Sequence, residues 1–400
     1  MRPISKKILL HIGAGKCGSS SIQKTLTFNP TFGYKGGGPG PVNYWLIQNG
    51  MAFKSPNVTS LAFGQDYLHS NQLIWRDLDR PCIHKCLKDL IAKMESHEVA
   101  IVSAEVIGHQ IFKIVENART FCDCSIDQNL EITALFFTRD IFTLVESGFY
   151  QWGLWSHTTL EKWIEKIISD VSNRHGAIAQ STLEFGCNNL VVYHLNQGNL
   201  LDPFFTILEG WGYLKEQFTI TELMRSNSRA SLDDIRLQKR NEGLREIHKP
   251  RTEFFLEQIR AEGNLPYVKT PNLLTESNVS AIVSQFSEDR ELLQMFCSEE
   301  TKEILRREFS QEHLLSFDLR DPKNDPYETL REPPSIEYLE RLSALLIKKI
   351  FAQQDFITAP EINLWERDQA IAERDQAIAE KEMILNSRIW KYTKLWRKLR

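Results

Sequence analysis

The sequence lacks three features that would assign it to a simple class. No apolar stretch reaches the roughly 20 residues that a membrane-spanning helix needs. The formal net charge is −4, which argues against general nucleic-acid binding. The seven cysteines are odd in number and irregularly spaced. Neither Cys82–Cys86 nor Cys122–Cys124 has a second ligand pair at zinc-site spacing, so we expect free thiols and no metal site.

The N-terminus also lacks a recognisable targeting segment. Met1, Arg2 and Pro3 precede the first expected strand directly, so we expect no signal peptide. We therefore expect a reduced, cytoplasmic protein.

What the chain does contain is enough apolar material for a large core. Its 400 residues exceed one average domain, and 42% of them are hydrophobic. We expect an α/β domain over residues 1–320, a linker and helix over 321–360, and a heptad-repeat helix over 361–400.

Short apolar runs alternate with amphipathic stretches through the first half of the chain. Expected strands follow Lys7 and cover 99–105, 132–138 and 189–195, and expected helices cover 19–26, 82–94, 141–155, 160–171 and 177–185. This alternation predicts a largely parallel β-sheet flanked by helices. Later helices are expected at 232–245, 251–261, 289–309 and 336–351.

A glycine- and serine-rich loop links the first strand to the first helix. Its residues include Gly13, Gly15, Lys16, Cys17, Gly18, Ser19 and Ser20. Glycines let backbone N–H groups face an anion, and the helix start adds positive potential. A Walker A loop places its lysine directly after the second glycine. Here Lys16 lies within the loop, which predicts a P-loop-type phosphate site of another kind.

Two further polar groups follow expected strands. Glu105 ends the strand over 99–105, and Arg139 ends the strand over 132–138, eight residues before Ser147. In parallel sheets, ligands bind beyond the carboxyl ends of the strands. An arginine there suits a phosphate, although a local Arg139–Asp140 ion pair is the alternative.

The loop His11–Gln23 resembles the 5′-phosphosulfate loop of sulfotransferases that use 3′-phosphoadenosine-5′-phosphosulfate (PAPS), specifically the bacterial carbohydrate-type branch. That resemblance implies that the loop from Gly13 to Ser20 holds the 5′-phosphosulfate and that Lys16 stabilises the departing oxygen. It also implies that Arg139 and Ser147 bind the 3′-phosphate. Cys17 is expected to fill the turn.

The general base is open between two residues. The resemblance favours Glu105 in a [ST]-x-E element, and His109 is the second candidate. A capping or ion-paired role for Glu105 is the alternative. The segment around Arg225 and Arg229 resembles a late nucleotide-binding element of the same family. The loop has no Walker-type lysine–serine pair for Mg²⁺, so a metal-free reaction is expected.

The tail over 361–400 contains a tandem heptad repeat, Glu366–Ala372 and Glu373–Ala379. Only one position of the expected coiled-coil seam is apolar, which favours weak self-association or partner packing. The basic and aromatic end over 387–400 is typical of helices on anionic membranes, with a solvated helix end as the alternative. It resembles tails of surface-polysaccharide enzymes.

The expected activity is therefore transfer of a sulfuryl group from PAPS to a carbohydrate or glycolipid hydroxyl, with no nucleic-acid partner and with peripheral membrane contact or self-association through the tail. A P-loop kinase or NTPase is one alternative, although no clear Walker B run is present. The other is a non-catalytic adaptor that acts through its tail.

Overall fold

The computed structural model describes residues 6–15, 17–48, 51–58, 68, 70, 80–104, 130–156, 158–184, 186–220, 223–224, 231–240, 265–325, 327–358, 374–375, 378 and 381. The predictions for Lys16, Glu105, His109, Arg229, the helix over 251–261 and most of the tail lie outside these residues.

The chain divides into two compact units. The first comprises Met1–Thr59, Tyr67–Ser226 and Leu274–Leu319, and the second Ser60–Asp66, Asn227–Leu273 and Arg320–Arg400. The segment over 227–273, which the sequence assigns to the first domain, belongs to the second unit.

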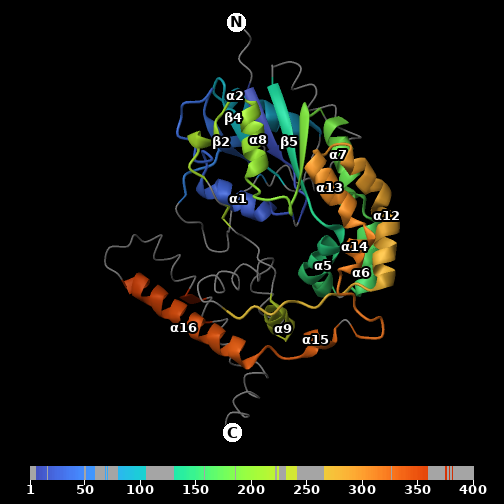
Figure 1. Ribbon diagram of the computed structural model, residues 1–400. Coiled ribbons are helices and arrows are strands. Elements are labelled where there is room, and N and C mark those ends of the chain that lie inside the picture. The colour runs from blue at the N-terminus through green and yellow to red at the C-terminus, as the bar shows by residue number, and fades with distance from the viewer. Residues whose placement is uncertain are drawn as a thin grey trace. The chain divides into compact units, whose positions relative to one another are not determined.

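A six-stranded sheet forms the centre of the first unit (Figure 1). The strands are β1 (Lys6–His11), β2 (Val42–Gln48), β3 (Met51–Lys54), β4 (Val99–Ser103), β5 (Leu130–Thr138) and β6 (Asn189–His194). Their order is β3-β2-β4-β1-β5-β6, and only the β2–β3 pair is antiparallel. The predicted α/β fold with a mostly parallel sheet is confirmed.

Helices and short 3₁₀ turns of the first unit flank this sheet. The helices are α1 (Ser19–Phe28), α2 (Arg80–Lys93), α5 (Ile141–Gln151), α6 (Leu160–Ser169), α7 (His175–Glu184), α8 (Asp202–Gly210), α12 (Glu276–Gln294), α13 (Glu299–Glu308) and α14 (Gln311–Leu315). The 3₁₀ turns cover Gly153–Trp155, Val171–Asn173 and Lys215–Gln217.

Two neighbouring residues of β5 show how both faces of the sheet are covered. Phe136 and Phe137 are fully buried, and side chains of consecutive strand residues point to opposite faces. Phe137 packs on Phe204 of α8, whereas Phe136 packs edge-on against His175 of α7. Figure 1 shows α8 and α7 on either side of the strands. The core is therefore continuous through the sheet.

The structure differs from the sequence prediction in several places, including the short helices α14 and α15 (Glu328–Arg331), which were not predicted. β2, β3 and α8 were not predicted. In α8, the spacing of Phe204, Ile207 and Leu208 suits a helix, and this signal was missed.

The single helix expected over 289–309 was wrong. α12 ends at Gln294, and α13 begins after Ser298, whose hydroxyl accepts a bond from the Thr301 N–H. A serine N-cap starts a new helix there.

The second unit is largely helical over its described residues. Its helices are α9 (Leu232–Arg240), α15 (Glu328–Arg331) and α16 (Ile336–Thr358). Apolar side chains of α9 and α16, including Ile235, Tyr338 and Leu342, are buried. None of the described helices in either unit combines the length and apolar character needed to cross a bilayer.

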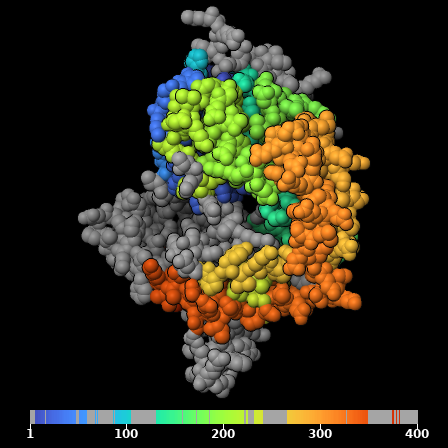
Figure 2. All heavy atoms as spheres, viewed as in Figure 1, coloured from blue at the N-terminus to red at the C-terminus, as the bar shows by residue number. Residues whose placement is uncertain are grey.

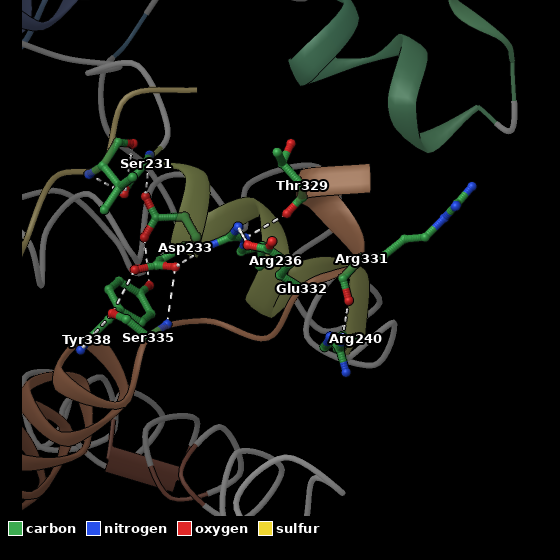
Figure 3. Close-up of polar contacts among 11 residues, drawn as sticks. Ser231, Asp233, Arg236, Arg240, Thr329, Arg331, Glu332, Ser335 and Tyr338 are labelled. Carbon is green, nitrogen blue, oxygen red and sulfur yellow. Dashed lines mark hydrogen bonds and ion pairs between the residues drawn. The ribbon is translucent and has the colours of Figure 1, made fainter. Parts of the chain in front are cut away.

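Buried charges connect α9 to the segment before α16 (Figure 3). Asp233 is fully buried and accepts bonds from the hydroxyl and N–H of Ser335. The Arg236 side chain donates to the Thr329 carbonyl at 2.8 Å and contacts Asp233 and Glu332. This arginine therefore fastens two separate stretches of chain by its planar fork.

Candidate functional site

The loop after β1 runs along the end of β5. The N–H of Ile12 donates to the Leu135 carbonyl at 3.1 Å, and the N–H of Ala14 donates to the Phe137 carbonyl at 3.0 Å. Phe137 in turn donates to the Gly13 carbonyl at 2.7 Å. The parallel ladder thus continues past β1, to a point two residues before Arg139. The loop and Arg139 consequently lie at one edge of the sheet.

A tight turn then leads from the loop into α1. The Ala14 carbonyl accepts bonds from the Cys17 N–H at 3.2 Å and from the Ser19 hydroxyl at 3.1 Å. Gly18 follows with a φ of 82°, in the left-handed region that favours glycine. Cys17 is fully buried in this turn. Ser19 is also buried, whereas Ser20 is partly exposed.

The start of α1 differs from those of five other helices in this unit, although α8 also begins without a side-chain cap. Side chains of Asp140, Thr159, Thr275, Ser298 and Ser310 cap α5, α6, α12, α13 and α14, respectively. In α1 the N-cap is Gly18, which makes no side-chain cap bond, and the first turn has no acidic residue. The positive end of the α1 dipole therefore has no carboxylate of its own first turn beside it.

His11 lies at the end of β1, directly before the loop. It is fully buried, its Nδ1 lies 2.7 Å from the Ser103 hydroxyl on β4, and its ring packs edge-on against Phe137. Burial lowers the pKa of His11 to about 3, so the ring is neutral at pH 7. His11 therefore supports the loop as an uncharged core residue.

Arg139 lies between β5 and α5, directly after the strand next to the loop. Its side chain is partly buried, and Asp140 caps α5 by accepting from the Thr143 N–H at 2.8 Å. Ser147 lies in the second turn of α5, and its hydroxyl donates to the Leu144 carbonyl at 3.1 Å. The Asp140 carboxylate is also 3.0 Å from His313 of α14. Asp140 thus contacts a cap partner and a histidine.

Sequence reasoning missed a buried ion pair behind Arg139. Arg290 of α12 lies 3.1 Å from Glu308 of α13, and both side chains are almost fully buried. Burial raises the pKa of Glu308 to about 7, with Arg290 acting in the opposite direction and Asp140 adding to the rise. Burial therefore affects the pKa of Glu308 more strongly than the ion pair with Arg290 does. Only the charged, amphipathic character of these helices could have hinted at the pair.

Segments far apart in sequence meet at this side of the unit. The Thr301 hydroxyl of α13 donates to the Gln197 side chain, which follows β6, at 2.8 Å. The backbone of Cys297 forms an isolated parallel β-bridge with Val192 of β6. Figure 2 shows the orange surface of α12 and α13 adjoining the green surface formed by residues around β6. His194, at the end of β6, is buried, and burial together with Arg290 lowers its pKa to about 4.

The structure brings most described candidates to one edge. The glycines, Cys17, Ser19 and Ser20 of the loop lie beside the strand that leads to Arg139. Ser147 lies farther along α5. On the other side of β1, Ala104 donates to the His11 carbonyl at 2.9 Å, so the described part of β4 ends at this edge too. Lys16, Glu105, His109 and Arg229 lie outside the described residues.

Chemically, this edge combines a helix start without a side-chain cap and an arginine on the adjacent strand, which suits two separate anionic groups. Among the described residues, no group of three or more His, Cys, Asp or Glu side chains gathers in a way that could hold a metal ion. Comparison of the chain with models of protein families and with curated proteins finds no match.

Proposed function

We propose that the chain is a PAPS-dependent sulfotransferase that acts on a carbohydrate hydroxyl. The observation that supports this most is the placement of two anion-binding elements at the ends of neighbouring parallel strands. The glycine loop follows β1 and Arg139 follows β5, and backbone bonds join the loop to β5. PAPS carries phosphate groups at both its 5′ and its 3′ positions, so it needs two such elements.

The described residues fit such a ligand. On the 5′ side, a helix start without a side-chain cap or first-turn acid suits the phosphosulfate, and Gly18 lets the backbone turn closely. On the 3′ side, the Arg139 guanidinium would bind the second phosphate through charge-assisted hydrogen bonds. Asp140 is turned to other partners, because its carboxylate caps α5 and contacts His313. The Thr143 N–H and His313 therefore compete with Arg139 for the Asp140 carboxylate.

Bound PAPS would supply an activated sulfuryl group. The chain would contribute positioning and electrostatic stabilisation, which dominate transfers of this type. The Lys16 ammonium would stabilise the negative charge on the oxygen of the departing phosphate or donate a proton to it. Glu105, or His109 in its place, would accept the proton of the acceptor hydroxyl at a carboxylate oxygen or a ring nitrogen.

Calorimetric titration of the full chain tests this proposal. We expect 3′-phosphoadenosine 5′-phosphate (PAP) to bind more tightly than ATP–Mg²⁺. Arg139→Ala should weaken PAP binding roughly 10- to 100-fold, as expected for loss of charged hydrogen bonds. Arg306→Ala is the control, since Arg306 is an exposed arginine of the same unit that pairs with Glu303.

Three results would contradict the proposal or part of it. Preference for ATP–Mg²⁺ would favour the kinase or NTPase alternative. If neither nucleotide binds, the adaptor alternative is favoured. An equal loss of PAP affinity in Arg139→Ala and Arg306→Ala would remove the specific role of Arg139.

A further inference from the structure

The buried pair Arg290–Glu308 contacts the chain before, at and after Arg139: a side-chain hydroxyl before it, its own carbonyl, and a backbone N–H two residues after it. The Arg290 Nη2 donates to the Arg139 carbonyl at 3.0 Å, and its Nη1 donates to the Thr138 hydroxyl at 3.2 Å. Glu308 Oε1 accepts the N–H of Ile141, the first residue of α5. Three of the four residues from Thr138 to Ile141 are therefore held by two side chains of α12 and α13.

Stability alone does not account for this pair, because burying two charges costs desolvation free energy. Arg290 is 2% exposed and Glu308 3% exposed, and buried ion pairs often stabilise no better than apolar residues of the same size. What apolar residues could not do is accept the Ile141 N–H and donate to the Arg139 carbonyl. The specific consequence of this pair is thus the backbone conformation at Arg139.

At the start of α5, two carboxylates accept backbone N–H groups of the first turn. Glu308 accepts from the Ile141 N–H, and Asp140 accepts from the Thr143 N–H. Two carboxylates therefore occupy amide donors that α5 would otherwise offer to an external anion. In α1, by contrast, the N-cap residue is Gly18, which has no side chain to cap the first turn.

We infer that Arg290 and Glu308 are positioning residues for Arg139, holding its backbone so that its guanidinium faces the 3′-phosphate of the nucleotide. This inference rests on the proposed function. Neither residue touches the nucleotide in this arrangement. They act through the carbonyl of Arg139 and the N–H of Ile141.

The experiment compares PAP with adenosine 5′-monophosphate (AMP), which lacks only the 3′-phosphate. Arg290→Lys in the full chain replaces the planar fork with a single ammonium. We expect its PAP affinity to fall about tenfold, while its AMP affinity stays within about twofold of the wild type. Glu308→Gln keeps the side-chain shape and a carbonyl acceptor but removes the charge, and a loss of about threefold for PAP alone is expected.

Arg236→Lys is the matched control. Arg236 also donates to a backbone carbonyl and contacts two carboxylates (Figure 3), but it belongs to the second unit. Its substitution should leave the ratio of AMP to PAP dissociation constants unchanged. Thermal unfolding of each variant shows whether it is folded at the titration temperature.

The outcomes distinguish failure of the proposed function from failure of the positioning role of Arg290 and Glu308. If the wild type binds AMP and PAP equally, or Arg139→Ala keeps the preference for PAP, the proposed function fails. If Arg139→Ala loses the preference but Arg290→Lys and Glu308→Gln keep it, the positioning role is overturned and the proposed function stands. Equal loss of both nucleotides in these two variants, or a changed ratio in Arg236→Lys, also overturns it. If Arg290→Lys does not fold, Glu308→Gln decides.

Discussion

At the scale of single residues, Gly18 joins the loop to α1 under two constraints. Its φ is 82°, and a Cβ added there would lie 2.5 Å from the Leu200 Cδ1 atom. Gly37 has almost the same φ, 84°, but its nearest neighbour is a Gln217 side-chain nitrogen at 3.4 Å. Substitution of Gly37 therefore tests the backbone strain alone, whereas substitution of Gly18 adds the steric conflict with Leu200.

Gly18→Ala should lower the free energy of unfolding by about 2–3 kcal/mol. A left-handed alanine costs roughly 1–2 kcal/mol, and the conflict with Leu200 adds the cost of overpacking. Gly37→Ala should show only the first part. Urea unfolding of both variants measures the difference, and equal losses would show that Leu200 yields without cost.

His11 makes stability depend on pH below neutrality. Its folded pKa is about 3, lowered from 6.5 by burial, so between these values the unfolded chain binds one proton more than the folded chain. Stability therefore falls as the pH drops from 6.5 towards 3, by about 1.4 kcal/mol per pH unit from this group. The contribution is fully present above pH 6.5.

His11→Asn should flatten this dependence, because asparagine can still reach Ser103 but does not titrate. Unfolding midpoints at pH 7.0 and 4.5 measure the effect, and His97→Asn, at an exposed histidine, is the control. His194 acts in the same direction and remains in both variants. If His11→Asn and the wild type lose equal stability on acidification, His11 is not the source.

At the scale of elements, the start of α5 depends on Asp140. One carboxylate oxygen accepts the N–H and hydroxyl of Thr143, each at 2.8 Å, and the other contacts His313. Asp140→Ala should lower the free energy of unfolding by about 1–2 kcal/mol, mainly through loss of the cap. Asp140→Asn should lose less than about 1 kcal/mol, because asparagine caps equally well and the His313 contact is partly exposed.

Chemical denaturation measures both Asp140 variants. Thr159→Ala removes the cap of α6 and serves as a reference for an ordinary cap in the same unit. An Asp140→Asn loss as large as that of Asp140→Ala would mean that the charge, and not the cap, matters at this position.

At the scale of the whole molecule, the chain forms two units, and the described residues of each include a buried polar network. In the second unit, Asp233 holds the Ser335 hydroxyl at 2.8 Å, and Asp234 accepts from the Tyr338 hydroxyl at 2.6 Å. Asp233→Ala leaves Ser335 without its carboxylate partner and Arg236 without one of its two. Breaking a buried network in this way typically costs about 3 kcal/mol or more.

Hydrogen exchange measured by mass spectrometry tests this expectation by region. Asp233→Ala should raise amide exchange in α9 and in the first turns of α16, because both lose a tertiary contact. Peptides from β1 and β5 report on the first unit in the same experiment. Unchanged exchange in α16 would show that Ser335 does not need Asp233 to hold this helix.

The sequence alone predicted the parts of the fold whose signals are local. An apolar run followed by glycines predicted β1, the loop and α1, and similar runs predicted β4, β5 and β6. Residues 42–54 show no clean alternation, so β2 and β3 required the structure, whereas the helical spacing of Phe204, Ile207 and Leu208 in α8 was missed. The break between α12 and α13 was missed because helix propensity continues across it, while the Ser298 cap and the bridge from Cys297 to β6 end it.

The candidate site divides in the same way. The glycine loop after β1 and the arginine after β5 could be predicted from the sequence. Both depend on glycine conformation or on a strand end, which are determined within a few residues. Only the tertiary structure decided that β1 and β5 are neighbours and that Arg290 and Glu308 hold the turn at Arg139. These contacts join residues more than 100 positions apart, and burial selects them only once the sheet and its helices have packed together.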